Sequence, residues 1–207
     1  MSANHAAFNL IFRFVENYVS PIAGRISSQR HVMAIRDGFI SAMPFMIVGS
    51  FLLVFAYPPF SPDTTWGFAR AWLDMAKQFE GQILTPFDMT MGIMSIYICA
   101  AIAYNLGKHY VKSHQLDPFM CAMLSLMAFL LVAAPKTKGT LPVDSLGGTG
   151  IFTAILVAIY CVEMMRFLKA HNIGIRLPEQ VPPMIKNSFD LLIPVLVVVV
   201  TLYPLSL

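Results

Sequence analysis

The sequence predicts an all-α polytopic membrane protein, with about five transmembrane helices and short amphipathic helices at the membrane interface. Five long apolar segments carry this prediction, and the last of them, LLIPVLVVVVTLYPLSL, continues to the end of the chain at Leu207. Hydrophobic residues make up 57% of the chain and charged residues only 12%, about half of the ~25% typical of globular domains. A soluble α-domain is disfavoured, because its surface would hold too little charge to stay dispersed.

The N-terminal segment predicts an amphipathic helix rather than a signal peptide. Apolar residues recur at helical spacing from Phe8 to Ile22, and charges such as Arg13 and Glu16 interrupt any continuous apolar signal core. We expect this helix to end near Pro21. The sequence leaves two placements open: on the membrane surface, or packed against the rest of the protein.

The first span is predicted at residues 38–57, with Pro44 and Gly49 inside the apolar run. Such residues are tolerated in membranes because neighbouring helices satisfy the backbone groups that they free. A polar segment follows, and apolar residues recurring between Trp66 and Phe79 predict a second amphipathic helix. Its tryptophans are typical of a membrane interface.

Four further spans are predicted at residues 87–106, 119–134, 150–168 and from 188 onward. The third span lies between Pro118 and Pro135, so it is short and has little tilt. The connection at residues 173–187 holds three prolines, which exclude a continuous helix.

The fifth span has the features of a helix start. Asn187 or Ser188 is a suitable N-cap, and Asp190 lies in the first turn, where the helix dipole favours a negative charge.

The flanking charges predict the orientation in the membrane. One side carries ten Lys and Arg, in the N-terminal tail and the second and fourth connections, and the other side carries four. The more basic side is normally cytoplasmic. We therefore expect a multi-pass membrane protein with a cytoplasmic N-terminus and the end of the fifth span outside.

Few charged residues lie within the spans, where they usually mark transport pathways. Asp88 lies at the predicted outer start of the second span, where it favours the helix N-terminus, with a place in a permeation path as the alternative. Glu163 lies near the inner end of the fourth span, and Arg166 follows at i+3, so an interfacial ion pair is expected.

The loop before the fourth span contains the candidate substrate-binding residues Gly147, Gly148 and Thr149. Glycines let backbone approach a ligand closely. The alternative is a tight loop that only leads into the helix. The run is not a phosphate loop, because no Gly-Lys-Ser/Thr follows it.

No residues are predicted to be catalytic or to bind a metal or cofactor. The three cysteines, Cys99, Cys121 and Cys161, lie in apolar runs without ligand-like spacing, so we expect them to be packing residues.

Small residues in the first two spans predict close helix packing, which in lipid depends on such residues. They serve either self-association or packing within one chain. The set is Gly38, Ser41, Ala42, Gly49, Ser50, Gly92, Ser95, Ala100, Ala101 and Ala103.

Three stretches together resemble one family. RHVMAIRDGFISAMPFMIVGS from Arg30, LGGTGIFTAILVAIYCVEMMRFL from Leu146 and IRLPEQVPPMIKNSFDLLIP from Ile175 are similar to the membrane subunit, enzyme IIC, of bacterial sugar phosphotransferase systems. The branch is the lactose/cellobiose/diacetylchitobiose one. The last stretch carries an LP-x-x-VP-x-x-I-x-x-SF pattern characteristic of that family.

The resemblance implies that residues 1–207 form the N-terminal, dimer-interface half of an enzyme IIC domain. Complete members have about ten spans, and their essential His and the Glu of an Asn-Glu-Pro-type motif lie in the second half. Neither motif can be carried over to this chain. We therefore expect a fragment or truncated permease that does not transport by itself.

The resemblance also implies a function and partners. The function is phosphoenolpyruvate-dependent uptake of a β-disaccharide or β-glucoside, in which a separate IIB protein phosphorylates the sugar. The implied partners are a second copy, IIB and IIA components and the lipid bilayer, which in this family is the bacterial inner membrane. Two alternatives stand beside it: a non-transporting five-span interaction module that dimerises with full-length permeases, and half of an ion-coupled carrier, which the scarcity of intramembrane carboxylates disfavours.

Overall fold

The computed structural model describes residues 16, 20–133, 143–174, 182 and 189–204, which form helices and turns without a β-strand. The all-α prediction is confirmed for this part of the chain. The longer elements are α2 (Ser20–Ser27), α3 (Arg30–Ala56), α4 (Gly67–Asp88), α5 (Met94–His114), α6 (Pro118–Ala133), α7 (Ile151–Ala170) and α9 (Leu192–Leu202). Two short 3₁₀ helices, η2 (Val143–Ser145) and η3 (Gly148–Gly150), precede α7.

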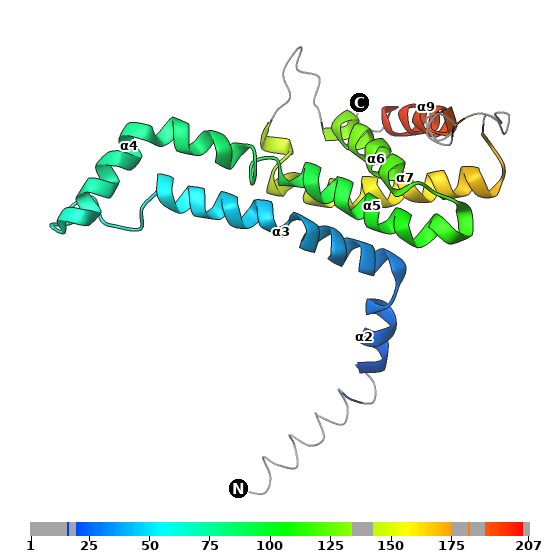
Figure 1. Ribbon diagram of the computed structural model, residues 1–207, viewed down its shortest axis with the longest axis horizontal. Coiled ribbons are helices and arrows are strands. Elements are labelled where there is room, and N and C mark those ends of the chain that lie inside the picture. The colour runs from blue at the N-terminus through cyan, green and yellow to red at the C-terminus, as the bar shows by residue number, and fades with distance from the viewer. Residues whose placement is uncertain (1–15, 17–19, 134–142, 175–181, 183–188, 205–207) are drawn as a thin grey trace, which may run out of the picture.

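Helix α5 lies at the centre of the bundle, in contact with α3, α6 and α7. Figure 1 shows α3 and α5 side by side, with α6 and α9 on the side of α5 away from α3. Apolar side chains on several faces of α5 explain this central position. Its fully buried residues include Ile98, Cys99, Ile102, Ala103 and Leu106.

Helix α3 is longer than the predicted first span, because it begins at Arg30 rather than at Gly38. Its 27 residues correspond to about 40 Å at 1.5 Å per residue, more than the ~30 Å of bilayer hydrocarbon. The additional turns carry Arg36 and Asp37, which are helical but too polar to count toward the apolar run. Pro44 is accommodated inside the helix.

The face of α3 away from α5 is apolar and exposed. Only 17% of the most apolar 18-residue window of α3 is buried. A continuous apolar surface of this kind is suited to lipid or to a protein partner rather than to water. Its exposed side chains include Ile40, Ile47, Val48, Phe51, Val54 and Phe55.

Small residues of α3 pack within the chain. A Cβ added to Gly38 would overlap the Ile102 side chain of α5, and one added to Gly49 would lie 2.5 Å from Met91 Cγ. Ala42 is also buried. These three members of the predicted association set are therefore occupied by intrachain packing, whereas Ser41 is exposed.

The predicted second amphipathic helix is present as α4, but it continues beyond Phe79 to Asp88. Phe79 itself breaks the helical geometry (φ −113°, ψ 16°) and kinks α4. Trp72 Nε1 donates to the carbonyl of Phe55 at 3.2 Å. Tyr57 Oη donates to Glu80 Oε1 at 2.9 Å. These bonds hold α4 along the end of α3.

The prediction of a helix over residues 87–106 is wrong at its start. The backbone turns after α4, where Gly92 N–H donates to the carbonyl of Phe87 at 3.1 Å, and α5 begins only at Met94. A Cβ at Gly92 would crowd the carbonyl oxygen of Asp88 at 2.5 Å. Asp88 is therefore the last residue of α4. The expectation that it stabilises the N-terminus of the second span is wrong.

The predicted third and fourth spans agree closely with α6 and α7. Among the described residues, two helices are long and apolar enough to cross a membrane, α3 and the segment Gly148–Ala170. Helices α6 and α9 are apolar but shorter. The number of five spans is thus not confirmed.

The N-terminal prediction is only partly covered by the described residues. Helix α2 begins at Ser20 and continues to Ser27, so Pro21 lies in the first turn of a helix. Where the predicted preceding helix ends stays a prediction, because residues 17–19 lie outside the described residues. Proline is favoured in the first turn of a helix, where its missing N–H costs no hydrogen bond. Most of residues 8–22 and of the proline-rich connection, with the N-caps Asn187 and Ser188, lies outside the described residues.

Candidate functional site

The predicted glycine loop is docked against the start of α5 by Ser95. The Ser95 backbone N–H donates to the carbonyl of Leu146 at 3.0 Å, and its hydroxyl donates to the carbonyl of Gly147. Ser95 is fully buried. Two bonds from one residue therefore fix the position of the loop relative to α5.

Two glycines of this loop are required by close packing. A Cβ at Gly147 would lie 3.0 Å from the carbonyl oxygen of Gly92, and one at Gly150 would overlap the carbonyl oxygen of Ser145. Such close contacts between backbone segments are expected if the glycines form only a tight loop that leads into the helix. Glycine at these two positions consequently has a structural explanation.

Gly148 and Thr149 are exposed. The hydroxyl of Thr149 donates to the carbonyl of Asp144 at 2.6 Å, inside its own loop. A Cβ at Gly148 would meet only the end of the Met94 side chain, at 3.4 Å. Substrate contact by Gly147, Gly148 and Thr149 stays a prediction.

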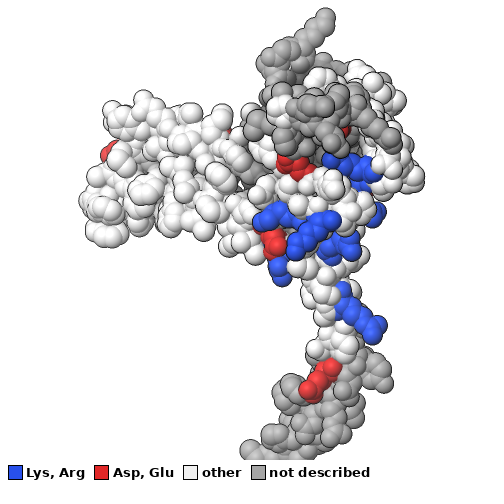
Figure 2. All heavy atoms as spheres, turned by 45° about the vertical axis from the view of Figure 1, so that its right-hand side comes forward, with Lys and Arg blue, Asp and Glu red and all other residues white. Residues whose placement is uncertain are grey.

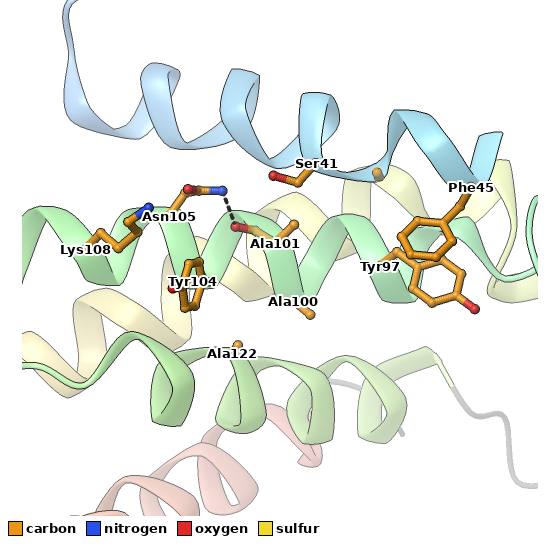
Figure 3. Close-up of a pocket in the computed structure, with 10 residues that line it drawn as sticks. Ser41, Phe45, Tyr97, Ala100, Ala101, Tyr104, Asn105, Lys108 and Ala122 are labelled. Atoms are coloured by element: carbon orange, nitrogen blue, oxygen red, sulfur yellow. Dashed lines mark hydrogen bonds between the residues drawn. The ribbon is translucent and has the colours of Figure 1, made fainter. Parts of the chain in front are cut away.

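A groove of about 440 Å³ lies between α3 and α5. Figure 3 shows its wall on α5, where the lining residues recur at helical spacing, facing α3 above and α6 below. The small residues leave the space that larger side chains would fill. The lining consists of Ser41, Ala42, Phe45, Tyr97, Ala100, Ala101, Tyr104, Asn105, Lys108 and Ala122.

Most polar groups in this groove are bonded within the protein. The Ser41 hydroxyl donates to the carbonyl of Asp37 at 2.7 Å, and Asn105 Nδ2 donates to the carbonyl of Ala101 at 2.9 Å. Tyr97 Oη donates to the carbonyl of Met89 at 2.8 Å. A sugar needs several free donors and acceptors, so this groove is poorly suited to one.

Basic side chains gather where α3 begins and where α5 and α7 end. We call this the basic end of the bundle. Figure 2 shows Lys and Arg there and on α2, and almost none on the α3–α4 arm in this view. The residues of the basic end are Arg30, Arg36, Lys108, Lys112, Arg166 and Lys169.

Glu163 joins three helices at the basic end. Its Oε1 accepts from Tyr110 Oη of α5 at 2.5 Å and lies 2.9 Å from His31 Nε2 of α3. Its Oε2 lies 2.7 Å from Arg166 Nε, which confirms the expected ion pair. That nitrogen is not aligned as a hydrogen-bond donor, so the contact is mainly electrostatic.

The aromatic ring of Tyr110 also faces two cations. The guanidinium carbons of Arg30 and Arg166 each lie 5.2 Å from its centroid, within the range of cation–π attraction.

Lys169 makes a second set of contacts at the basic end. Its Nζ lies 3.3 Å from Asp190 Oδ2 and donates to the carbonyl of Gln115 at 3.0 Å. The basic end is thus tied together by charge.

Sequence reasoning found Glu163–Arg166 but missed Tyr110 and His31, which lie 53 and 132 residues away from Glu163. No local pattern reports such partners. All three cysteines are free and buried, as expected. Among the described residues no group of three His, Cys, Asp or Glu is placed to hold a metal ion.

Comparisons with known proteins agree on one family. A sequence model described as "Phosphotransferase system, EIIC" matches residues 36–207. The chain is 36% identical over 206 residues to a cellobiose-specific EIIC component of Geobacillus stearothermophilus, and 33% identical over 192 residues to a lactose-specific EIICB component of Lactococcus lactis. These alignments cover 90% of the chain, but 43% and 32% of the relatives.

One solved structure is also similar. It is the crystal structure of the transporter ChbC, described as the IIC component of an N,N'-diacetylchitobiose-specific phosphotransferase system. The TM-score is 0.77 at 35% sequence identity, over 93% of this chain and 46% of that one. The chain therefore spans less than half the length of the proteins that it matches here.

Proposed function

The chain belongs to the EIIC family of the phosphotransferase system, and on this premise we propose that it takes part in phosphoenolpyruvate-dependent uptake of a β-disaccharide or β-glucoside. The observation that carries the proposal is the 36% identity to a cellobiose-specific component across 90% of the chain. In this role the chain supplies a membrane subunit and performs no phosphorylation itself.

The proposed sugar class follows from the names of the relatives, which mention cellobiose, lactose and N,N'-diacetylchitobiose. All three are β-linked disaccharides. A permease of this class presents the sugar to a phosphorylating partner on the cytoplasmic side.

We propose that this partner is a IIB component, itself served by IIA. The support is the name EIICB of the lactose-specific relative, which combines the C and B components in one chain. A second copy of this chain is the other proposed partner. The exposed apolar face of α3 is available for it.

The proposed topology has five spans, with the N-terminus in the cytoplasm of a bacterial cell and the basic end facing the cytoplasmic leaflet. Its support is the charge distribution, because Lys and Arg gather at one end of α3, α5 and α7. The positive-inside rule assigns that end to the cytoplasm.

We further propose that residues 1–207 correspond to the N-terminal, dimer-interface part of an EIIC domain and do not move sugar by themselves. The support is the 43% coverage of the cellobiose-specific relative. In that arrangement Gly148 and Thr149, exposed before α7, together with Gly147 form one side of the sugar path.

A chimera tests the function. Residues 1–207 are joined to the part of the cellobiose-specific relative that follows its aligned region, in cells lacking their own β-glucoside permeases but supplied with that relative's IIA and IIB. We expect labelled cellobiose to accumulate, and excess unlabelled cellobiose but not mannitol to compete. The control is the relative's own N-terminal part with the same junction. A membrane-inserted chimera that takes up nothing, while this control is active, would contradict the proposal.

A further inference from the structure

The groove between α3 and α5 has the length of one bilayer leaflet. Its lining on α5 runs from Tyr97 to Lys108, twelve residues whose first and last Cα atoms are about 16 Å apart along the helix axis. Half of the ~30 Å hydrocarbon thickness is about 15 Å. A groove between transmembrane helices with this length matches one acyl chain lying parallel to the helix axes.

The two ends of the groove differ in chemistry, as Figure 3 shows. At one end the rings of Phe45 and Tyr97 stack, with centroids 4.4 Å apart and an interplanar angle of 9°. At the other end Lys108 belongs to the basic end of the bundle. Phe45 lies near the middle of α3 and Tyr97 in the first turn of α5, and an acyl chain that entered beside Lys108 would finish at this pair.

Lys108 carries a positive charge that the described residues do not neutralise. Its Nζ lies 5.3 Å from the Tyr104 ring centroid, and no described carboxylate lies within ion-pair distance of it. Asp37, one turn before Ser41 on α3, pairs with Arg36 at 2.8 Å. The mouth of the groove is therefore suited to an anion.

We propose that this groove binds one acyl chain of an anionic phospholipid, whose phosphate pairs with Lys108. The apolar floor of alanines accepts the chain, and the basic end lies at the level of the headgroups. Basic pockets between membrane helices commonly bind anionic lipids in this way. The proposal uses the topology proposed above but does not depend on sugar transport.

The test is native mass spectrometry of the full chain released from nanodiscs that contain dioleoyl phosphatidylglycerol and dioleoyl phosphatidylcholine. We expect one retained phosphatidylglycerol per chain. Lys108→Gln should weaken its retention about fivefold, the factor that one lysine at a membrane surface contributes. Lys112→Gln is the matched control: it removes the same charge from the same helix one turn away, outside the groove, and should change retention less than twofold.

A second variant keeps the test independent of charge. Ala101→Leu fills the groove and leaves Lys108 in place, so phosphatidylglycerol retention should fall at least as far as in Lys108→Gln. Circular dichroism and a monodisperse profile establish that each variant is folded. The proposal would be overturned if the two lysine substitutions reduced phosphatidylglycerol retention equally, or if the chain retained the two lipids equally. A lipid-free dimer in which a second copy covers the groove would also overturn it.

Discussion

Tyr110 on α5 donates its phenolic hydrogen to Oε1 of Glu163 on α7 over 2.5 Å, at the basic end of the bundle. The same oxygen lies 2.9 Å from His31 Nε2 on α3. One carboxylate therefore connects α3, α5 and α7, three of the helices that contribute to the core. The side chain of Glu163 is 24% exposed, so water screens these interactions only in part.

Glu163→Gln should destabilise the folded chain by about 1–3 kcal/mol, because it removes the negative charge that strengthens the hydrogen bonds with Tyr110 and His31 and attracts Arg166. Thermal unfolding in detergent measures the change. The control is Asp37→Asn, which affects an exposed pair with Arg36 and should change stability by less than about 0.5 kcal/mol. Similar effects of the two substitutions would refute a central role for the Glu163 carboxylate.

Gly38→Ala should destabilise the packing of α3 on α5 by about 1–3 kcal/mol, the usual cost of overpacking. The added methyl group would overlap Ile102, including its backbone nitrogen at 2.9 Å. Gly81→Ala in α4 is the matched control, since nothing lies within 4 Å of its Cβ position and alanine is favoured in a helix. The yield of folded protein and its melting temperature should fall only for Gly38→Ala. A stable Gly38→Ala protein would contradict the described helix contact.

Ser95→Ala should loosen the glycine loop while the backbone bond to Leu146 persists. The loss of one hydroxyl bond to a carbonyl is expected to cost about 0.5–1.5 kcal/mol. Hydrogen exchange of residues 147–150 should quicken relative to the parent. Ser50→Ala is the control, because it removes only a bond to the carbonyl of Ile47 in the same helix, and it should leave the exchange of residues 147–150 unchanged. If Ser95→Ala also left that exchange unchanged, the loop would be held by other contacts.

Single cysteines at Ser113 and Gly139, in a chain whose native cysteines are replaced by alanine, test the proposed topology. An impermeant maleimide added to intact cells should label position 139 and should label position 113 only after the cells are opened. The expectation rests on the charge at the end of α5, which carries Lys112 and His114 in its last turn. If position 113 were labelled in intact cells and position 139 only in opened cells, the proposed orientation would be contradicted.

Hydropathy predicted where apolar segments lie better than where helices begin and end. Residues 87–106 form one apolar run, yet the backbone breaks between Asp88 and Met94, because a turn around Gly92 uses residues that are as apolar as their neighbours. The start of α3 was missed because its first turns carry charged residues, which a search for apolar residues leaves out of a span. They are helical but would lie outside the hydrocarbon.

The glycine loop illustrates what sequence could tell about the site. The run of glycines predicted either a close approach of backbone to a ligand or a tight loop, and the structure places Gly147 and Gly150 against carbonyl oxygens of the protein itself. The sequence could not reveal that Ser95, more than fifty residues earlier, holds this loop against α5. The groove around Lys108 and the partners of Glu163 likewise depend on tertiary packing, for which a single sequence holds no local signal.

The most direct test of the proposed function is the chemical form in which sugar appears inside membrane vesicles. Right-side-out vesicles carrying the chimera are loaded with the soluble phosphotransferase components and either phosphoenolpyruvate or ATP, and labelled cellobiose is added outside. We predict labelled sugar phosphate only with phosphoenolpyruvate, and none in vesicles that carry residues 1–207 alone. Accumulation of free, unphosphorylated cellobiose that follows an ion gradient and ignores phosphoenolpyruvate would contradict the account.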